Sequence, residues 1–329
     1  MRQFTIDRRR LVTAAAAAVL AIGAVPFAFA QDFPSRPIRM IVPFAAGGPA
    51  DLLARAIAPA MSDALKQPIV IENRAGGGGS TGVDGVAKAA PDGYTIGITG
   101  PGALVAAPFM TKVPYDATKD LAAIARVARM NGVIVVPATS PYMTLADLVK
   151  AAGEAPGKLS FGSAGAGTLT HLAGELLNME AKIKLVHVPY RGAAPAVADL
   201  LGGHINSLLP DLPGVLPQIG AGSIRALAIS SASRSQKIPN VPTTGEQGLP
   251  NVLADSWYGL IAPTGTPPEI QKKLYDAVLV ALNSKEAQDQ IAKQGADVAP
   301  SSPQEFAALI AEEQGRWKRV IEVTGAKME

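Results

Sequence analysis

The chain contains no cysteine among its 329 residues, and only 5% of them are aromatic. Without cysteine it can form neither a disulfide nor a lipid-modified cysteine anchor. It also lacks a heptad pattern, a long low-complexity tract and tandem repeats. What remains is a composition rich in alanine, glycine and aliphatic residues, which is typical of packed α/β layers.

The N-terminus carries the pattern of a cleavable secretory signal. The basic segment Arg8–Arg10 precedes an apolar run from Leu11 to Val25, and small residues stand at Ala28 and Ala30. The run is shorter than the roughly 20 residues that span a bilayer, which favours cleavage after Ala30 over a permanent anchor. The segment around Arg8–Arg10 also resembles a twin-arginine signal, so the general and the twin-arginine export routes both stay open.

An excess of charge is also missing once this signal is removed. Residues 1–30 hold four arginines and one aspartate of the chain's 30 basic and 27 acidic residues, which leaves 26 of each sign. A neutral mature chain lacks the electrostatic footprint of a protein that binds nucleic acid or an anionic membrane. Its length is sufficient for two domains.

Short aliphatic runs alternate with helical patterns, which predicts an α/β fold with mostly parallel sheets flanked by helices. The strand candidates are Ile38–Val42, Ile69–Glu72, Thr95–Thr99, Val133–Val136, Lys158–Phe161, Lys184–Val188, Ile205–Leu209, Ile224–Ile229 and Trp257–Ile261. The helix candidates are Asp51–Leu65, Leu145–Ala152, Thr168–Met179, Ala194–Leu201, Pro268–Leu282 and Pro303–Val323.

Two breaks in this alternation predict two lobes joined by a two-strand hinge. A long connection is expected at Asp116–Asn131, and a polar, proline-rich stretch lies at Ser233–Pro250. We therefore expect a signal peptide at 1–30, a discontinuous first lobe at 31–128 plus 252–329, and a second lobe at 129–251 inserted into it. Because open parallel sheets bind ligands beyond the carboxyl ends of their strands, the loops there should face one cleft.

Two glycine-rich turns between a strand and a helix candidate point to what the cleft binds. They are Phe44–Asp51 and Gly162–His171. Backbone N–H groups in such a turn can approach an anion, which the dipole of the following helix also favours. Ser163 and Thr168 add hydroxyl groups to the second turn. We expect the two turns to hold a small anionic molecule between the lobes.

A third glycine run, Gly76–Gly82, fits two catalytic patterns and completes neither. Its spacing matches the dinucleotide fingerprint and the nucleophile elbow of a serine hydrolase centred on Ser80. The dinucleotide site needs an acid after the next strand, and Thr95–Gly100 has none. The hydrolase needs a histidine near the chain end, and the last one is His204. We expect no enzyme and no cofactor; a secreted hydrolase using Ser80 is the alternative.

A metal site is not expected either. His171 and Glu175 are four residues apart and would share one face of a helix. No third ligand is evident near them, whereas protein zinc sites use at least three protein ligands.

Seven segments in chain order carry a resemblance to a known family. They are PIRMIVPFAAGGPAD, PIVIENRAGGGGSTG, APDGYTIGI, LSFGSAGAGTLTHLAGELL, VHVPYRGAAPAVADLLGGHI, RALAISSASRSQKIPNVPTTGEQGLP and WYGLIAPTGTP. They resemble the Bug-type solute receptors of tripartite tricarboxylate transporters. The resemblance implies a type II periplasmic-binding-protein fold, a periplasmic location and a monomeric receptor that closes on a small carboxylate. It further implies delivery of that ligand to the membrane subunits of a transporter.

Carried over position by position, the resemblance also implies a set of ligand-binding residues. They are Phe44, Ala46, Gly47 and Gly48 of the first turn, Ser163, Ala164, Gly165 and Thr168 of the second, and Gly100 and Asp211 in the cleft. Ala166 stands where the family commonly has asparagine, which hints at a less polar ligand. The expected ligand is a di- or tricarboxylate or an aromatic acid, and a periplasmic sensor for a signalling partner is a second alternative.

Overall fold

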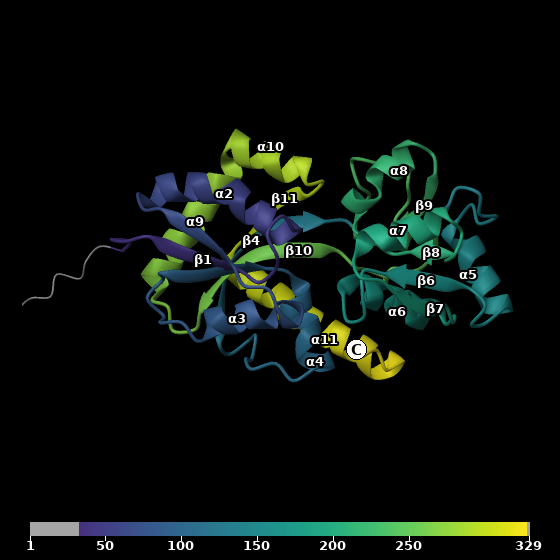
Figure 1. Ribbon diagram of the computed structural model, residues 1–329, viewed down its shortest axis with the longest axis horizontal. Coiled ribbons are helices and arrows are strands. Elements are labelled where there is room, and N and C mark those ends of the chain that lie inside the picture. Colours follow the sequence, from purple (N-terminus) through teal and green to yellow (C-terminus); the bar gives the residue numbers. More distant parts are fainter. Residues whose placement is uncertain (1–32, 328–329) are drawn as a thin grey trace, which may run out of the picture.

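The computed structural model describes residues 33–327 and contains two α/β lobes that lie side by side (Figure 1). This arrangement confirms the predicted two-lobed α/β fold. The predicted signal peptide and its cleavage point lie outside the described residues. Within residues 33–327, no helix is both long enough and apolar enough to cross a membrane.

The first lobe is built on a six-stranded sheet in the order β11-β4-β10-β3-β1-β2. Its strands are β1 (Ile38–Val42), β2 (Ile69–Asn73), β3 (Thr95–Thr99), β4 (Leu121–Met130), β10 (Ser256–Pro263) and β11 (Asp297–Ser301). β1 is parallel to β2 and β3, whereas β10 is antiparallel to β3 and β4, and β11 is antiparallel to β4.

The second lobe contains a five-stranded sheet in the order β7-β6-β8-β5-β9. Its strands are β5 (Val133–Pro137), β6 (Ser160–Ser163), β7 (Val186–Pro189), β8 (Ser207–Leu208) and β9 (Ile224–Ile229). β6 is parallel to β7 and β8, and β5 is antiparallel to β8 and β9.

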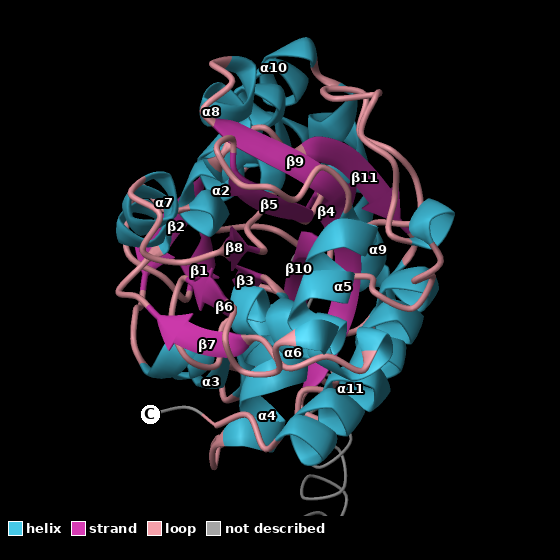
Figure 2. Ribbon diagram, turned by 90° about the vertical axis from the view of Figure 1, so that its right-hand side faces the viewer, coloured by secondary structure: helices cyan, strands magenta, loops and turns pink. Residues whose placement is uncertain are grey.

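Helices cover both faces of each sheet (Figures 1 and 2). Those of the first lobe are α2 (Pro49–Leu65), α9 (Pro268–Asn283) and α10 (Lys285–Lys293) on one face, and α3 (Ser80–Ala87), α4 (Ala107–Met110) and α11 (Pro303–Thr324) on the other. Those of the second lobe are α5 (Leu145–Glu154) and α6 (Leu169–Ala181) on one face, and α7 (Ala193–Leu201) and α8 (Leu216–Gly220) on the other. α5 and α11 each begin with a capping box, at Thr144 and Ser302.

The prediction of mostly parallel sheets is wrong, because both sheets are mixed. The segment Asp116–Asn131, expected to be a connection, contains the ten-residue strand β4. Its sequence is rich in alanine and carries Arg126 and Arg129, so it lacks the β-branched run by which strands are recognised. β4 is nevertheless a central strand, since β10 and β11 pair with it from either side.

The chain crosses between the lobes from β4 to β5 and again from β9 to β10, as the predicted two-strand hinge requires. Asn131 and Gly132 form the first crossing, and both are buried. Asn131 Nδ2 donates to Ser231 Oγ at 3.0 Å, and the Ser230 amide donates to the Gly132 carbonyl at 2.9 Å. The Ser231 hydroxyl also donates to Asp255 in the second crossing. The two crossings are therefore tied to each other inside the protein.

The C-terminal helix α11 makes a further, non-covalent connection between the lobes. It packs against β4 of the first lobe and against α6 of the second. At its centre Glu313, which is 3% exposed, accepts hydrogen bonds from Trp257 Nε1 at 2.9 Å and from Arg316 Nη2 at 2.8 Å. Trp317 Nε1 donates to the same carboxylate at 3.4 Å. One buried carboxylate thus joins α11 to the hinge strand β10.

Replacing Glu313 with leucine is expected to destabilise the protein by about 1–3 kcal/mol, because it leaves two buried indole N–H groups and the partly buried Arg316 guanidinium without their acceptor. Urea unfolding followed by tryptophan fluorescence measures the loss, since Trp257 and Trp317 are the chain's two tryptophans. Glu322→Leu on the same helix is the matched control, because the Glu322 side chain is 65% exposed. Equal unfolding midpoints for the two variants would contradict the role of Glu313.

Candidate ligand-binding cleft

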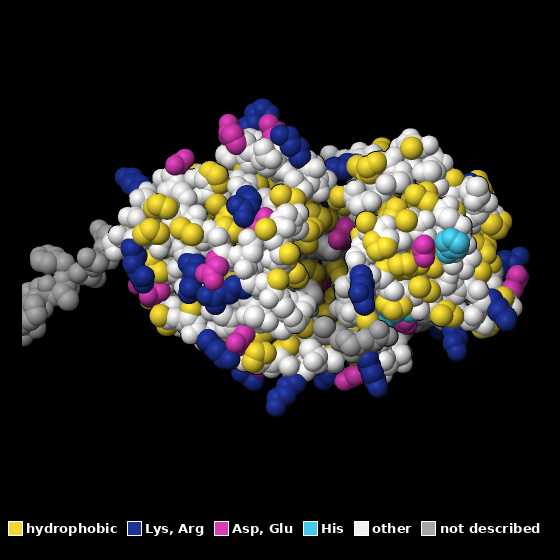
Figure 3. Space-filling model, viewed as in Figure 1, with side chains coloured by type: hydrophobic (Ala, Val, Ile, Leu, Met, Phe, Trp, Pro, Cys, Tyr) yellow, Lys and Arg dark blue, Asp and Glu magenta, His cyan; other side chains and the backbone are white. Residues whose placement is uncertain are grey.

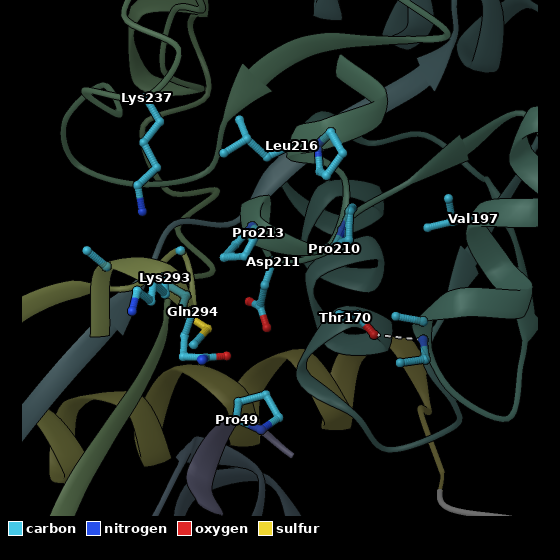
Figure 4. Close-up of a pocket in the computed structure, with 17 residues that line it drawn as sticks. Pro49, Thr170, Val197, Pro210, Asp211, Pro213, Leu216, Lys237, Lys293 and Gln294 are labelled. Carbon is cyan, nitrogen blue, oxygen red and sulfur yellow. Dashed lines mark hydrogen bonds between the residues drawn. The ribbon is translucent and has the colours of Figure 1, made fainter. Parts of the chain in front are cut away.

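A cavity of about 730 Å³ lies between the lobes, in the groove that Figure 3 shows across the middle of the molecule. Small-molecule sites usually measure about 300–1,000 Å³. Among its lining residues only Asp211, Lys237 and Lys293 carry charge, and most of the others are apolar (Figure 4). The lining residues are Pro49, Met130, Ala164, Thr170, Ala193, Val197, Pro210, Asp211, Pro213, Gly214, Leu216, Pro217, Lys237, Ala292, Lys293, Gln294 and Gly295.

The first predicted turn reaches the cavity at the start of α2, where Pro49 lines it. Asp51 in the first helical turn is 1% exposed and accepts hydrogen bonds from the Gly47 amide and from Asn73 Nδ2, both at 2.9 Å. Arg55 Nε donates at 2.9 Å, and this bond lowers the pKa of Asp51 to about 2. Gly47 has a φ of 82°, which favours glycine. Asp51 is therefore the anchor of the turn.

The amides of the second turn are mostly bonded within their own lobe. The pairs are Ala164 N to Thr170 Oγ1 at 2.9 Å, Gly165 N to Ser163 Oγ at 3.1 Å, Gly167 N to His171 Nδ1 at 3.1 Å, and Thr168 N to Gly165 O at 3.2 Å. The turn keeps its shape through these bonds, so these amides are not bare donors as the sequence suggested.

Each turn keeps at least one amide that is available to a ligand. In the part of the chain that the structure describes, the amides of Ala46 and Ala166 donate to no protein group. Ala46 is exposed and Ala166 is half-buried. An N–H group that water can reach, next to a helix N-terminus, is a suitable donor for an anion.

Ser163 has a structural partner. It is 1% exposed, and its hydroxyl is hydrogen-bonded to His187 Nε2 at 2.6 Å. The ring of His187 stacks on that of His171 with 3.8 Å between centroids, and burial lowers the pKa of His187 to about 4. His171 Nε2 lies 3.8 Å from Glu175, and no group of three metal-ligating side chains exists among the described residues. The rings of His171 and His187 therefore pack against each other beneath the second turn, and both are neutral at pH 7.

Asp211 stands where the hinge meets the cavity. Its Oδ1 accepts a hydrogen bond from Ser256 Oγ of β10 at 2.7 Å, and its backbone bridges to Gly132 of the first crossing. Burial raises the pKa of Asp211 to about 6, and the negative charge of Asp255 adds to this effect. The carboxyl group points into the cavity (Figure 4). A carboxyl with this pKa is an ionised acceptor at neutral pH and a donor below pH 6.

Two of the ten predicted binding residues, Ala164 and Asp211, line the cavity. Four more precede the lining residue Pro49 in the first turn: Phe44, Ala46, Gly47 and Gly48. Three more lie next to the lining residues Ala164 and Thr170 of the second turn: Ser163, Gly165 and Thr168. Gly100 is buried, and an added Cβ would lie 3.0 Å from the Trp257 carbonyl, which makes it a packing glycine. Direct contact of any of these residues with a ligand stays a prediction.

One wall of the cavity consists of residues that were not predicted from the sequence. Lys237 comes from the loop between β9 and β10, Lys293 is the last residue of α10, and Gln294 and Gly295 follow it. An added Cβ on Gly295 would lie 2.5 Å from Pro213, so the lobes meet closely at this wall. Lys237 lies in the proline-rich stretch Ser233–Pro250, and the other three lie at the end of a helix that the sequence did not predict. No ligand-binding pattern marked any of them.

The glycine run Gly76–Gly82 supports the first turn. An added Cβ on Gly82 would lie 2.6 Å from Pro43, and one on Gly79 would lie 3.0 Å from the Phe44 ring. The Ser80 hydroxyl donates to the Gly77 carbonyl at 2.8 Å. The run therefore allows α3 to pack closely behind the turn, which explains its glycines without a nucleotide or a nucleophile.

Replacing Asp51 with alanine is expected to cost roughly 1–3 kcal/mol, because it leaves buried donors unpaired. Hydrogen exchange at residues 44–48 should accelerate. The stabilisation is complete above the unfolded-state pKa of 3.8 and is lost as the pH falls toward 2. Asp63→Ala is the control, since Asp63 lies exposed on the same helix; unchanged exchange in Asp51→Ala would disprove the anchor.

Comparison with known proteins agrees with this geometry. The model of the tripartite tricarboxylate transporter family receptor matches residues 53–326. Protein BugT of Bordetella pertussis is 38% identical over 301 residues, which cover 91% of this chain and 92% of that protein. The structure of MatC from Rhodopseudomonas palustris with bound malate is 33% identical with a TM-score of 0.74, and covers 88% of this chain and 100% of its own. An R. palustris protein with adipate is also 33% identical, with a TM-score of 0.76 and 91% and 100% coverage.

These similarities confirm the resemblance drawn from the sequence. The family consists of periplasmic solute receptors, a class that binds its ligands without converting them, so the alternative of a hydrolase using Ser80 is wrong. The match extends over most of the chain and includes both lobes. The chain belongs to the receptor family of the tripartite tricarboxylate transporters.

Proposed function

We propose that the protein captures a small carboxylate-containing compound in the cleft between its lobes and delivers it to the membrane subunits of a transporter. The observation that carries the proposal is the cavity of about 730 Å³ flanked by two strand–turn–helix units, each with at least one accessible amide. The malate and adipate bound by two relatives support an organic acid as the ligand.

In this proposal, the ligand carboxylate lies between the two turns. The amides of Ala46 and Ala166 donate to it from opposite lobes, and the dipoles of α2 and α6 add to the attraction. The remaining predicted residues of both turns, Ser163 among them, hold these amides in position. A ligand that contacts both lobes stabilises the closed arrangement over an open one.

The walls of the cavity favour a ligand with an apolar body. Met130, Val197, Leu216 and several prolines line it, and aliphatic or aromatic carbon can pack against them. Di- and tricarboxylates and aromatic acids are therefore the proposed class.

The proposal also covers the processing, location and lobe boundaries of the chain. We propose cleavage after Ala30, function as a monomer in the periplasm, and lobes at 31–128 plus 252–329 and at 129–251. The chain crosses between the lobes from β4 to β5 and from β9 to β10. Both crossings lie close to the proposed boundaries, which supports these boundaries.

Thermal-shift measurements with succinate, malate, adipate, citrate and benzoate test the ligand class. At least one acid should raise the unfolding temperature, since a ligand at 100 times its Kd stabilises by about 2.7 kcal/mol. Ala164→Phe should abolish the shift by filling the cavity, whereas Ala90→Phe, at an exposed position outside the cavity, should keep it. No shift with any acid, or equal shifts in both variants, would refute the proposal.

The binding of the best acid is expected to depend on pH through Asp211. The pKa of Asp211 is about 6, and a bound carboxylate raises it further by charge repulsion. Affinity is therefore highest below about pH 6 and falls by up to about tenfold per pH unit above it. Calorimetric titration between pH 5.5 and 8 measures this dependence. Asp211→Asn keeps a partner for Ser256 and should flatten the curve; a flat curve in the parent protein would contradict the assignment.

A further inference from the structure

We propose that Lys237 is a second anion-binding point, which holds an acidic group at the end of the ligand away from the two turns. This proposal rests on the proposed function and adds to it a residue that selects ligands with two acidic ends.

The Lys237 ammonium is enclosed and has no hydrogen-bond partner. Nζ is buried and donates to no protein group in the described chain. The nearest acid is Asp297 of β11, whose Oδ1 lies 4.0 Å away, beyond hydrogen-bond distance. The Asp297 side chain is 43% exposed, so water weakens this ion pair further. A buried donor with unmet hydrogen-bonding capacity gains most from a partner that the ligand brings.

The position of Lys237 suits the far end of a ligand. Figure 4 shows Lys237 on the same side of the cavity as Lys293 and Gln294, with its ammonium end directed toward them. Thr170, beside the second turn, lies on the opposite side, and Asp211 lies between. An acid bound at the turns therefore extends past Asp211 toward Lys237.

The loop that carries Lys237 is held in place by its own contacts. Arg234 forms an ion pair with Glu246 at 2.9 Å and donates from Nη1 to the Pro239 carbonyl at 3.1 Å. Ser235 is 3% exposed, and its hydroxyl accepts from the Lys237 amide at 3.3 Å. The lysine thus starts from a fixed backbone, which reduces the entropy lost when it binds.

The alternative is that Lys237 only pairs with Asp297. Lys237 belongs to the loop after β9 and Asp297 to β11 of the first lobe, so their attraction also draws the lobes together. This alternative predicts equal effects for the loss of either partner and no distinction between ligands. Binding of a second acidic group predicts an effect of Lys237 alone, confined to ligands that have such a group.

Calorimetric titration at pH 7.5 with matched acids separates these cases. The probes are butyrate and succinate, hexanoate and adipate, and octanoate and suberate, each pair differing by one terminal carboxylate. The parent protein should bind at least one diacid more tightly than its monoacid. Lys237→Met should weaken that diacid about tenfold or more, the value of a charge-assisted hydrogen bond, and leave the monoacid unchanged.

Two control variants complete the test. Lys285→Met removes the same charge from α10, at a side chain that is 82% exposed and lies outside the cavity lining, and should change diacid binding by less than about twofold. Asp297→Asn removes the ion pair and should leave diacid binding equal or tighter.

The inference is overturned if Lys237→Met weakens monoacid and diacid alike, if Asp297→Asn reproduces its effect, or if Lys285→Met weakens the diacid equally. It is also overturned if the parent shows no preference for diacids. Absence of binding by all six acids instead refutes the proposed carboxylate function, and with it this inference.

Discussion

The paired crossings between the lobes are the constraint on which the rest of the structure depends. Asn131 and Gly132 in one crossing are buried and are hydrogen-bonded to Ser231 and Ser230 in the other, so the strands leave and return side by side. Asp211 is attached to both crossings, through its backbone bridge to Gly132 and its hydrogen bond to Ser256. The cavity therefore opens beside the hinge, and a rotation about the hinge changes the distance between its two walls.

The two glycine-rich turns show how a chain can form an anion site with few free donors. The amides of Gly47, Ala164 and Gly167 donate to the side chains of Asp51, Thr170 and His171, and these bonds fix the backbone before any ligand arrives. The cost of ordering the turns is thus met in folding rather than in binding. The stacked histidines below the second turn contribute shape without charge, since burial lowers the pKa of both rings.

Affinity and selectivity have separate structural sources in this cleft. The turns belong to the shared scaffold of the family and offer donors for a carboxylate of any acid. In the proposed complex, the apolar walls, Asp211 and Lys237 face the remainder of the ligand. The C-terminal helix, joined to β10 by Glu313, holds the lobes in register without taking part in the cavity.

The amino-acid sequence by itself determined the two-lobed α/β fold, the family and the positions of both turns. Strands with β-branched runs, such as Ile38–Val42 and Thr95–Thr99, were predicted to the residue, because local pattern and burial agree there. Only the tertiary structure decided that β4 is a central strand, that Ser163 serves His187, and that Lys237 and Lys293 share a wall with Asp211. Each of these depends on pairing between segments far apart in the chain, and long-range packing leaves no local pattern by which it can be recognised.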